Sequence, residues 1–506
     1  MNQTSPEKIS ETIEHLRRVF RSGRTKNVNY RRKQLEGIKR MVEENESLFV
    51  ESLHKDLKKP KFEAIMIETD YILNNVREML YNLNSYVKPT KVAKDLVLAF
   101  DDAFIQPEPY GLVLIIGTWN YPLIVCLSPL IGAIAAGNVA IVKPSEIAPN
   151  AADLFEKLLP QYVDKDCYRV INGDATVNQH LLKEKFDYIF FTGSQPIGRK
   201  VYASAVDNFT PVTLELGGKS PVYIDDSVID QDFCYKRLLW AKFINAGQTC
   251  VAPDYVLCSD KVAQRFIRSA KLILKQFYGN DVQKSKDLTR IINDNHFNRL
   301  VNLLESSSGE IVIGGSSDKN DRFIEPTILL NCSIDDPLMK EEIFGPILPI
   351  VIVSNVDEAI QLINRKSKPL TLYVFSQNQS VIDKISLETS SGSICANDAL
   401  IHLSVDALPF GGVGDSGFGV YHGKSTFDTF SHYKSVLIRG YNPLLEWVSS
   451  KRYPPYTESN LKRLLRVIKK RHLMPADSDW TVLFIFLLGA LSFYFLNNLT
   501  QYLAAK

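Results

Sequence analysis

Residues 111–142, GLVLIIGTWNYPLIVCLSPLIGAIAAGNVAIV, decide the fold of this 506-residue chain. Gly111–Ile116 and Val139–Val142 are short apolar runs that predict buried strands, and Leu123–Ala136 between them predicts an apolar helix. Strands that are apolar along their whole length and are separated by a helix are typical of a parallel sheet covered on both faces. The stretch therefore predicts an α/β fold.

The alternation of strands and helices continues toward the carboxyl terminus. Another strand is expected at 187–191, and a second αβ series runs from Glu215 to about Leu408, with strands expected at 220–224, 255–258, 347–353 and 370–375. At 506 residues the chain is long enough for two or three domains with large cores. We therefore expect two αβα domains.

The amino-terminal part reads differently, because residues 5–87 are helical in pattern. From Lys61 to Val87 the apolar positions recur at spacings of three, four or seven, and no Gly or Pro interrupts them, which predicts one long helix. Residues 95–107 have strand character with a turn expected at Asp101–Asp102, which indicates a hairpin.

Composition narrows the function. The formal net charge is +2, so nothing in the charge balance indicates a nucleic acid partner. The seven cysteines are scattered without a C-x-x-C pair, and the eight histidines show no metal-ligand spacing. We expect a reducing compartment, no disulfide framework and no metal.

Two segments carry candidate chemistry. Residues 243–250, FINAGQTC, place Cys250 after a run of small residues, and residues 214–219, LELGGK, place Glu215 before two glycines. A thiolate attacks a carbonyl readily, and a carboxylate can take a proton from a thiol or from water. The alternatives are an inert buried thiol and a structural ion pair between Glu215 and a lysine.

These segments resemble the cysteine and glutamate signatures of the aldehyde dehydrogenase superfamily. The resemblance continues through further blocks in family order: 117–122 (GTWNYP), 143–146 (KPSE), 191–194 (FTGS), 342–346 (EIFGP), 397–398 (ND) and 409–414 (PFGGVG). It implies an aldehyde dehydrogenase fold with a Rossmann-like cofactor domain, a catalytic domain and an oligomerisation hairpin.

The resemblance also implies domain bounds. Residues 1–214 would form the cofactor-binding domain with a bridging hairpin at about 90–107, 215–408 the catalytic domain, and 409–449 a return to the cofactor and oligomerisation region. Residues 450–479 would hold a linker and a basic amphipathic helix, and 480–496 a membrane helix.

By the same resemblance, Cys250 is the nucleophile, Glu215 activates water, and Asn120 donates to the oxyanion. NAD, with NADP possible, would contact the turn of Gly193, Ser194 and Gly198 and the remaining cofactor residues Lys143, Glu146, Glu342, Phe344 and Trp119. Taken without the resemblance, Asn120 reads equally well as a turn-capping residue. Likewise, Glu342 and Phe344 read as a surface acid and a core aromatic.

The carboxyl-terminal tail suggests a membrane. Residues 480–496, WTVLFIFLLGALSFYFL, are 17 residues without a charge; as a helix they would extend about 25 Å, just short of a ~30 Å hydrocarbon core. Residues 461–471 before them are basic and amphipathic. We expect a carboxyl-terminal anchor in an intracellular membrane, most simply the endoplasmic reticulum, with a cytosolic catalytic body. The alternatives are a buried terminal helix and a solvated basic face.

The blocks 250–255, 421–424 and 427–432 resemble the class 3 branch, and 452–455 (RYPP) before an apolar tail resembles the membrane-bound fatty aldehyde dehydrogenases. The resemblance implies a homodimer that oxidises long-chain fatty aldehydes to acids. Three alternatives stay open: a tethered enzyme for short-chain or aromatic aldehydes, a catalytically silent membrane scaffold, and a CoA-dependent acylating enzyme.

Overall fold

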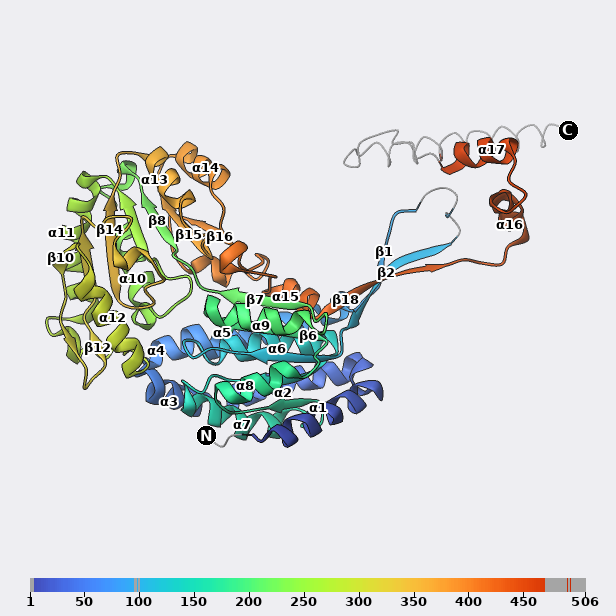
Figure 1. Cartoon of the computed structure of the whole chain (residues 1–506), viewed down its shortest axis with the longest axis horizontal. Helices are drawn as coiled ribbons and strands as arrows, with labels where there is room; N and C mark the ends of the chain where they lie inside the picture. Colours follow the sequence, from blue (N-terminus) through green and yellow to red (C-terminus); the bar gives the residue numbers. More distant parts are fainter. Residues whose placement is uncertain (1–3, 95–97, 99–100, 469–488, 490–491, 493–506) are drawn as a thin grey trace, which may run out of the picture. The chain divides into compact units, whose positions relative to one another are not determined.

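The computed structural model describes residues 4–94, 98, 101–468, 489 and 492. The chain divides into two compact units, one formed by 1–88 with 106–434 and the other by 89–105 with 435–506. Both large sheets belong to the first unit, and so do the helices α1 to α15 (Figure 1).

The first sheet has six strands in the order β17-β7-β6-β3-β4-β5, and β17 is the one antiparallel member. Its strands are β3 (Leu112–Ile116), β4 (Val139–Lys143), β5 (Tyr168–Val170), β6 (Tyr188–Gly193), β7 (Val212–Leu216) and β17 (Gly417–Phe418). From β3 the chain steps outward to β4 and β5, and from β6 it steps the opposite way to β7. Right-handed crossovers therefore place the connecting helices on both faces.

The helices around this sheet are amphipathic or wholly apolar. Helix α6 (Ile124–Ala136) is buried along its whole length except for Ile124, because it lies between β3 and β4 on one side and the amino-terminal helices on the other. The others are α1 (Pro6–Arg21), α2 (Val28–Glu44), α3 (Glu46–Leu57), α5 (Asp70–Tyr86), α7 (Pro149–Tyr162), α8 (Ala175–Lys183), α9 (Gln195–Val206) and α15 (Gly423–Thr429).

The second sheet has seven strands in the order β10-β13-β14-β9-β8-β15-β16, parallel except for β10. Its strands are β8 (Pro221–Ile224), β9 (Tyr255–Cys258), β10 (Glu310–Ile313), β13 (Thr327–Leu330), β14 (Ile347–Ile352), β15 (Thr371–Phe375) and β16 (Ser393–Ala396). Its helices are α10 (Asp232–Phe243), α11 (Asp260–Tyr278), α12 (Asp294–Ser306), α13 (Val356–Asn364) and α14 (Gln379–Glu388). The expected α/β architecture is confirmed, and the chain passes between the two sheets after Leu216.

Two sequence predictions in the amino-terminal part need correction. The helix expected over Lys61–Val87 is continuous but not uniformly α: a short α4 (Lys61–Glu63) and a π-helical stretch at Ala64–Thr69 precede α5. The predicted hairpin turn at Asp101–Asp102 was wrong. Asp102 begins β2 (Asp102–Pro109), which pairs with β1 (Thr90–Lys91), so the hairpin's connection comes before it.

The second unit contains β1 and the end of β18 (Ser431–Ile438), in a sheet of order β1-β2-β18, followed by α16 (Pro443–Ser449) and α17 (Glu458–Ile468). The linker expected at 450–460 begins with a 3-10 turn at Ser450–Arg452 and ends inside α17. Among the described residues no helix is both long and apolar enough to cross a membrane. The span expected at 480–496 lies outside the described residues except for 489 and 492.

Candidate active site

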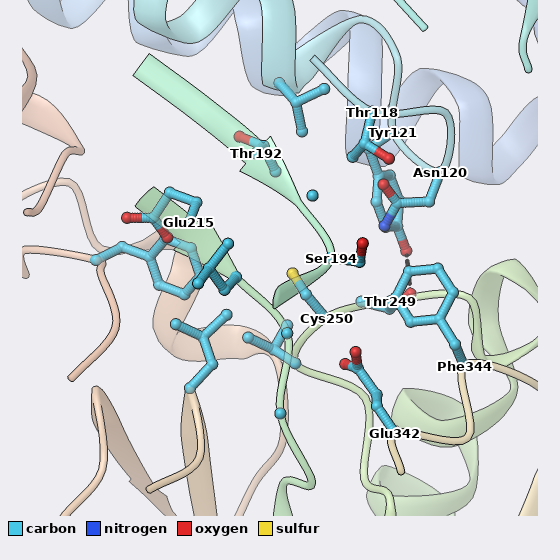
Figure 2. Close-up of a pocket in the computed structure, with 18 of the residues that line it drawn as sticks. Thr118, Asn120, Tyr121, Thr192, Ser194, Glu215, Thr249, Cys250, Glu342 and Phe344 are labelled. Atoms are coloured by element: carbon cyan, nitrogen blue, oxygen red, sulfur yellow. Dashed lines mark hydrogen bonds between the residues drawn. The ribbon is translucent and has the colours of Figure 1, made fainter. Parts of the chain in front are cut away.

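A cavity of about 720 Å³ lies in the first unit and gathers most of the predicted site residues. Its lining includes Trp119, Asn120, Gly193, Ser194, Glu215, Cys250, Glu342 and Phe344. Figure 2 shows the sulfur of Cys250 in the middle of this group, with Glu215 on one side and Glu342 and Phe344 on another. Lys143, Glu146 and Gly198 are not part of the lining.

A left-handed turn presents Cys250 to the cavity. Asn245 and Ala246 have φ values of 52°, and Gly247 has 72°. Such angles are uncommon for residues with a Cβ, and they change the chain's direction sharply between α10 and Cys250. Glycine is required at 247, because a Cβ there would lie 2.3 Å from the carbonyl oxygen of Gly345. Two hydrogen bonds of one glutamine side chain stabilise the turn: Gln248 Nε2 donates to the carbonyl oxygens of Asn245 and Arg290, both at 3.0 Å.

Asn120 is buried in a loop that touches this turn directly. Its Nδ2 donates to the carbonyl oxygen of Gln248 at 3.1 Å, and its own carbonyl accepts from Asn245 Nδ2 at 3.0 Å. Next to it, the Tyr121 hydroxyl and the Thr249 hydroxyl share a hydrogen bond of 2.7 Å (Figure 2). These contacts fix the side chain of Asn120 beside the cysteine turn.

Glu215 lies on β7, opposite Gly417 of β17. The residue is 3% exposed, and neither carboxyl oxygen has a hydrogen-bond partner in the structure. Burial therefore raises the pKa of this carboxyl well above its ordinary value. An unpartnered carboxyl in an apolar cavity is poised to bind water or to take up a proton.

The thiol of Cys250 is also neutral in this environment. Burial, followed by the neighbouring carboxyls of Glu342 and Glu215, raises its pKa to about 12. Backbone N–H groups of Cys250 and Val251 act in the opposite direction, with smaller effect. At neutral pH the thiol therefore needs a proton acceptor before it can act as a nucleophile.

The start of α9 fits a dinucleotide phosphate. Ser194 is the N-cap of this 12-residue helix and makes no side-chain cap hydrogen bond. The N–H groups of Gln195 and Ile197 therefore stay available to an anion, whereas Pro196 has no N–H to offer. A Cβ on Gly198 would lie 2.6 Å from Leu216, so glycine allows the helix to pack closely on β7. The residues at this turn therefore fit a bound NAD or NADP.

Lys143 is the last residue of β4 and pairs with Ile116, the last residue of β3, and Glu146 follows three residues later. Lys143 is 1% exposed and donates to Glu146 Oε2 at 3.0 Å and to the carbonyl of Pro144 at 2.8 Å. The paired Glu146 carboxylate is one-third exposed, so it can still accept from a hydroxyl of a ribose.

Glu342 lines the cavity close to the backbone of Gly217. A Cβ on Gly217 would fall 1.9 Å from Glu342 Oε2, so glycine at 217 lets this carboxyl approach the backbone. Burial raises its pKa to about 8. Phe344 packs edge-on against Trp119, with ring centroids 5.3 Å apart.

Sequence reasoning missed the apolar wall of the cavity. It is formed by Met66, Ile67, Tyr71, Ile124, Val125, Trp240, Leu400, Ile401, Leu403, Phe410 and Tyr421. These side chains come from five separate regions of the chain and form no motif, so only the fold brings them together. The one available signal was the excess of large apolar residues in otherwise polar loops, such as 400–403.

The Aldehyde dehydrogenase family matches residues 1–436 of the chain. Bovine aldehyde dehydrogenase family 3 member B1 is 47% identical over 463 residues, 92% of this chain and 98% of that protein. The dimeric NADP-preferring aldehyde dehydrogenase of dog is 46% identical over 449 residues, 88% of this chain and 98% of that protein. A substrate-bound aldehyde dehydrogenase (AldH) from Staphylococcus aureus has a TM-score of 0.88 and 41% identity, covering 92% of this chain and 99% of that one.

These matches cover nearly all of the first unit. The chain belongs to the aldehyde dehydrogenase family, in its class 3 branch, and is an NAD(P)-dependent oxidoreductase that acts on aldehydes.

Proposed function

We propose that this enzyme oxidises long-chain fatty aldehydes to carboxylic acids through a thiohemiacetal and a thioester on Cys250. The carrying observation is the apolar section of the cavity wall, to which Met66, Ile124 and Leu403 belong, in the same cavity as Cys250. A hydrocarbon chain would bury its surface against this wall with a gain of roughly 0.8 kcal/mol per methylene.

Cys250 attacks the aldehyde carbon as a thiolate, and solvent water at the cavity takes the proton that the thiol loses. The carbonyl oxygen then carries negative charge and needs donors that are already in place. We assign the Nδ2 of Asn120 and the backbone N–H of Cys250 to this role. Asn120 suits it because its side chain is held by Gln248 rather than free to rotate.

When bound, the nicotinamide cofactor accepts the hydride that leaves the thiohemiacetal. Gly193, Ser194 and the first turn of α9 would hold its phosphates, Lys143 and Glu146 its adenosine ribose, and Glu342 and Phe344 its nicotinamide ribose. Trp119 packs against Phe344 and supports that end of the site.

Glu215 is proposed to release the acid. Burial raises the pKa of its carboxyl and so favours the protonated form. Water that enters with turnover stabilises the ionised form, which then removes a proton from the water that attacks the thioester. The acid leaves and Cys250 is regenerated.

Domain roles follow the same proposal. Residues 1–214 would bind the cofactor, 215–408 would supply the nucleophile, and 409–449 would return to the cofactor and subunit-contact region. The sheet to which Glu215 belongs is the first one, so this glutamate would reach the cysteine from the cofactor side.

A membrane anchor would support the proposal of a long-chain aldehyde as the substrate. Long-chain aldehydes partition into lipid, and a tail at 480–496 behind a basic helix at 458–468 would keep the enzyme near them. We propose a homodimer with a cytosolic catalytic body on an intracellular membrane, of which the endoplasmic reticulum is the first candidate.

A chain-length series tests the proposal. Full-length enzyme would be assayed with NAD and NADP on hexanal, dodecanal, hexadecanal and benzaldehyde, and again after removal of the residues beyond Ser449. The proposal expects kcat/KM to rise with chain length, and the tail to matter mainly for the longest aldehydes presented in vesicles. A preference for hexanal or benzaldehyde in both proteins would instead favour the tethered short-chain or aromatic enzyme.

A further inference from the structure

Three ionisable side chains, those of Lys59, Glu63 and Glu68, lie in the part of the chain just before α5 and outside the cavity lining. Lys59 is 1% exposed and Glu68 is fully buried, and their side chains form an ion pair. Glu63 lies between them, and burial raises its pKa to about 7. Buried charges cost free energy, so their contacts deserve an explanation.

Beyond this pair, the Lys59 side chain also contacts the Asn120 loop. Its Nζ donates to the carbonyl oxygen of Asn120 at 3.1 Å and lies 4.3 Å from the centre of the Tyr121 ring. The ammonium therefore holds one peptide group and one aromatic face of the loop at the same time.

Glu68 holds the other end of the same loop. Its Oε1 accepts from Lys59, and its Oε2 accepts from the backbone N–H of Leu123 at 2.9 Å. The loop from 120 to 123 is thus fastened at its first carbonyl and its last amide by a single ion pair. It is this loop that presents the amide of Asn120 to the cavity.

The two members of the ion pair come from different local structures. Lys59 lies in the connection of residues 58–60, between α3 and α4, whereas Glu68 lies in the π-helical stretch Ala64–Thr69, whose turns are widened by hydrogen bonds from i to i+5. Glu63, at the end of α4, accepts from the backbone N–H of Asn245 at 3.0 Å. The ion pair therefore joins the connection before α4 to the helical segment after it.

Stability alone does not account for the pair. An apolar pair of similar volume is often as stable as a buried ion pair, or more so, because no charge has to be desolvated. What an apolar pair could not supply is the set of hydrogen bonds to the carbonyl of Asn120 and the amide of Leu123. Directed bonds to one loop indicate a role in holding its geometry.

We propose that Lys59 and Glu68 are positioning residues that fix the Asn120 amide where the oxyanion of the thiohemiacetal develops. The inference rests on the oxyanion role of Asn120 in the proposed function. A displacement of about 1 Å in a reacting group can cost on the order of 100-fold in rate, so a relaxed loop would slow the chemical step while leaving cofactor binding in place.

The test is the double variant Lys59→Met/Glu68→Leu in the full-length enzyme, which removes both charges together and leaves none unpaired. Pre-steady-state NADH formation should slow by about 10- to 100-fold, while the Kd of NAD and the thermal midpoint change little. Arg17→Met/Asp187→Leu is the matched control. There, too, a cation pairs at 3.1 Å with a carboxylate that accepts from a backbone N–H, that of Leu112, but at the opposite end of β3 from the site.

The decisive readout is the same change made in an Asn120→Ala background. If Lys59 and Glu68 act through Asn120, the double variant should cost less than about threefold there, because the group being positioned is gone. An equal loss in both backgrounds would overturn the positioning role while leaving the oxyanion role of Asn120 intact. An Asn120→Ala enzyme with an unchanged burst would instead refute the oxyanion role itself.

Glu68→Gln provides a second, milder variant that keeps an amide oxygen for the Leu123 N–H. The same cycle with Asn120→Ala decides the question if the double variant does not fold. A loss that depends on Asn120 supports the proposal, and a loss that does not depend on it, or no loss, overturns it.

Discussion

The side-chain amide of Asn120 donates to the carbonyl oxygen of Gln248 at 3.1 Å, two residues before the cysteine in sequence. An amide nitrogen carries two N–H groups, so this bond leaves the second for a substrate oxygen. The loop that we propose to stabilise the oxyanion and the turn that carries the proposed nucleophile are therefore joined through the same amide.

Asn120→Ala should lower kcat by about 10² to 10³, the usual cost of losing one oxyanion donor. The Kd of NAD, measured by fluorescence titration, should stay within about twofold of wild type. Loss of cofactor affinity in parallel with kcat would mean that the side chain supports the fold of the site rather than the oxyanion.

Cys250→Ser should abolish aldehyde oxidation, because a serine hydroxyl ionises far less readily than a thiol and lacks its nucleophilicity. NAD binding should persist. Cys234→Ser is the control: Cys234 is buried in α10 and does not line the cavity, so its loss should leave turnover unchanged. Aldehyde turnover by Cys250→Ser would refute the assignment.

Protonation of Glu215 should lower the deacylation rate on the acid side of its pH profile, which gives the profile an acid limb. Because burial raises the pKa of its carboxyl, the base form is absent at the pH where an ordinary glutamate is ionised, and the rate should rise with pH well above 4.5. Glu215→Gln should remove this limb and let the thioester accumulate. Stopped-flow traces would then show a full NADH burst followed by a slow steady state; an unaltered steady state would exclude the role.

Glu63 should make the protein less stable as pH rises from about 4.5 to about 7. Its folded pKa of about 7 lies above the ordinary value of 4.5, so the folded state holds a proton that the unfolded state has already lost. The destabilisation is absent below the unfolded pKa and complete above the folded one, on the order of 3 kcal/mol. Glu63→Gln should remove it, seen as a larger gain in the free energy of unfolding at pH 8 than at pH 5. Equal effects at both pH values would contradict the shift.

Glu146→Gln should shift cofactor use toward NADP. The carboxylate is paired with Lys143 but remains one-third exposed, so it would repel a 2′-phosphate. Removing its charge leaves Lys143 to attract that phosphate, and the ratio of kcat/KM for NADP to that for NAD should rise by about tenfold. Conversion of NAD and NADP by wild type and variant measures the ratio; a fall in it would be the opposite of this expectation.

The strands were predictable because they are buried on both faces, so their sequences are apolar without interruption. Tyr255–Cys258 was predicted to the residue, and the six other strands that the sequence predicted end within two residues of β3, β4, β6, β8, β14 and β15. The strands β5, β7, β10, β13, β16 and β17 were not predicted. The π-helical stretch could not be predicted, since the spacing of Ile65, Ile72 and Val76 suits an unbroken α-helix. The π-helical turns are recognised only in the structure, in which Glu68 contacts the loop of residues 120–123.

The site was predictable where its chemistry needs one residue type in a fixed local setting, as at Cys250. Lys59 and Glu68 lie in a stretch, KKPKFEAIMIE, whose charges look like those of any exposed helix. Their burial arises from packing against a loop some sixty residues later, and no local pattern encodes that.

The turn that carries Cys250 packs against the segment that carries Glu342 and Phe344, because a Cβ on Gly247 would lie 2.3 Å from the carbonyl oxygen of Gly345. A bulkier residue in this turn would therefore displace the segment that we propose to hold the cofactor. Engineering of substrate range should therefore begin at the distant apolar wall, where Met66, Leu400 and Leu403 can change size independently of the nucleophile.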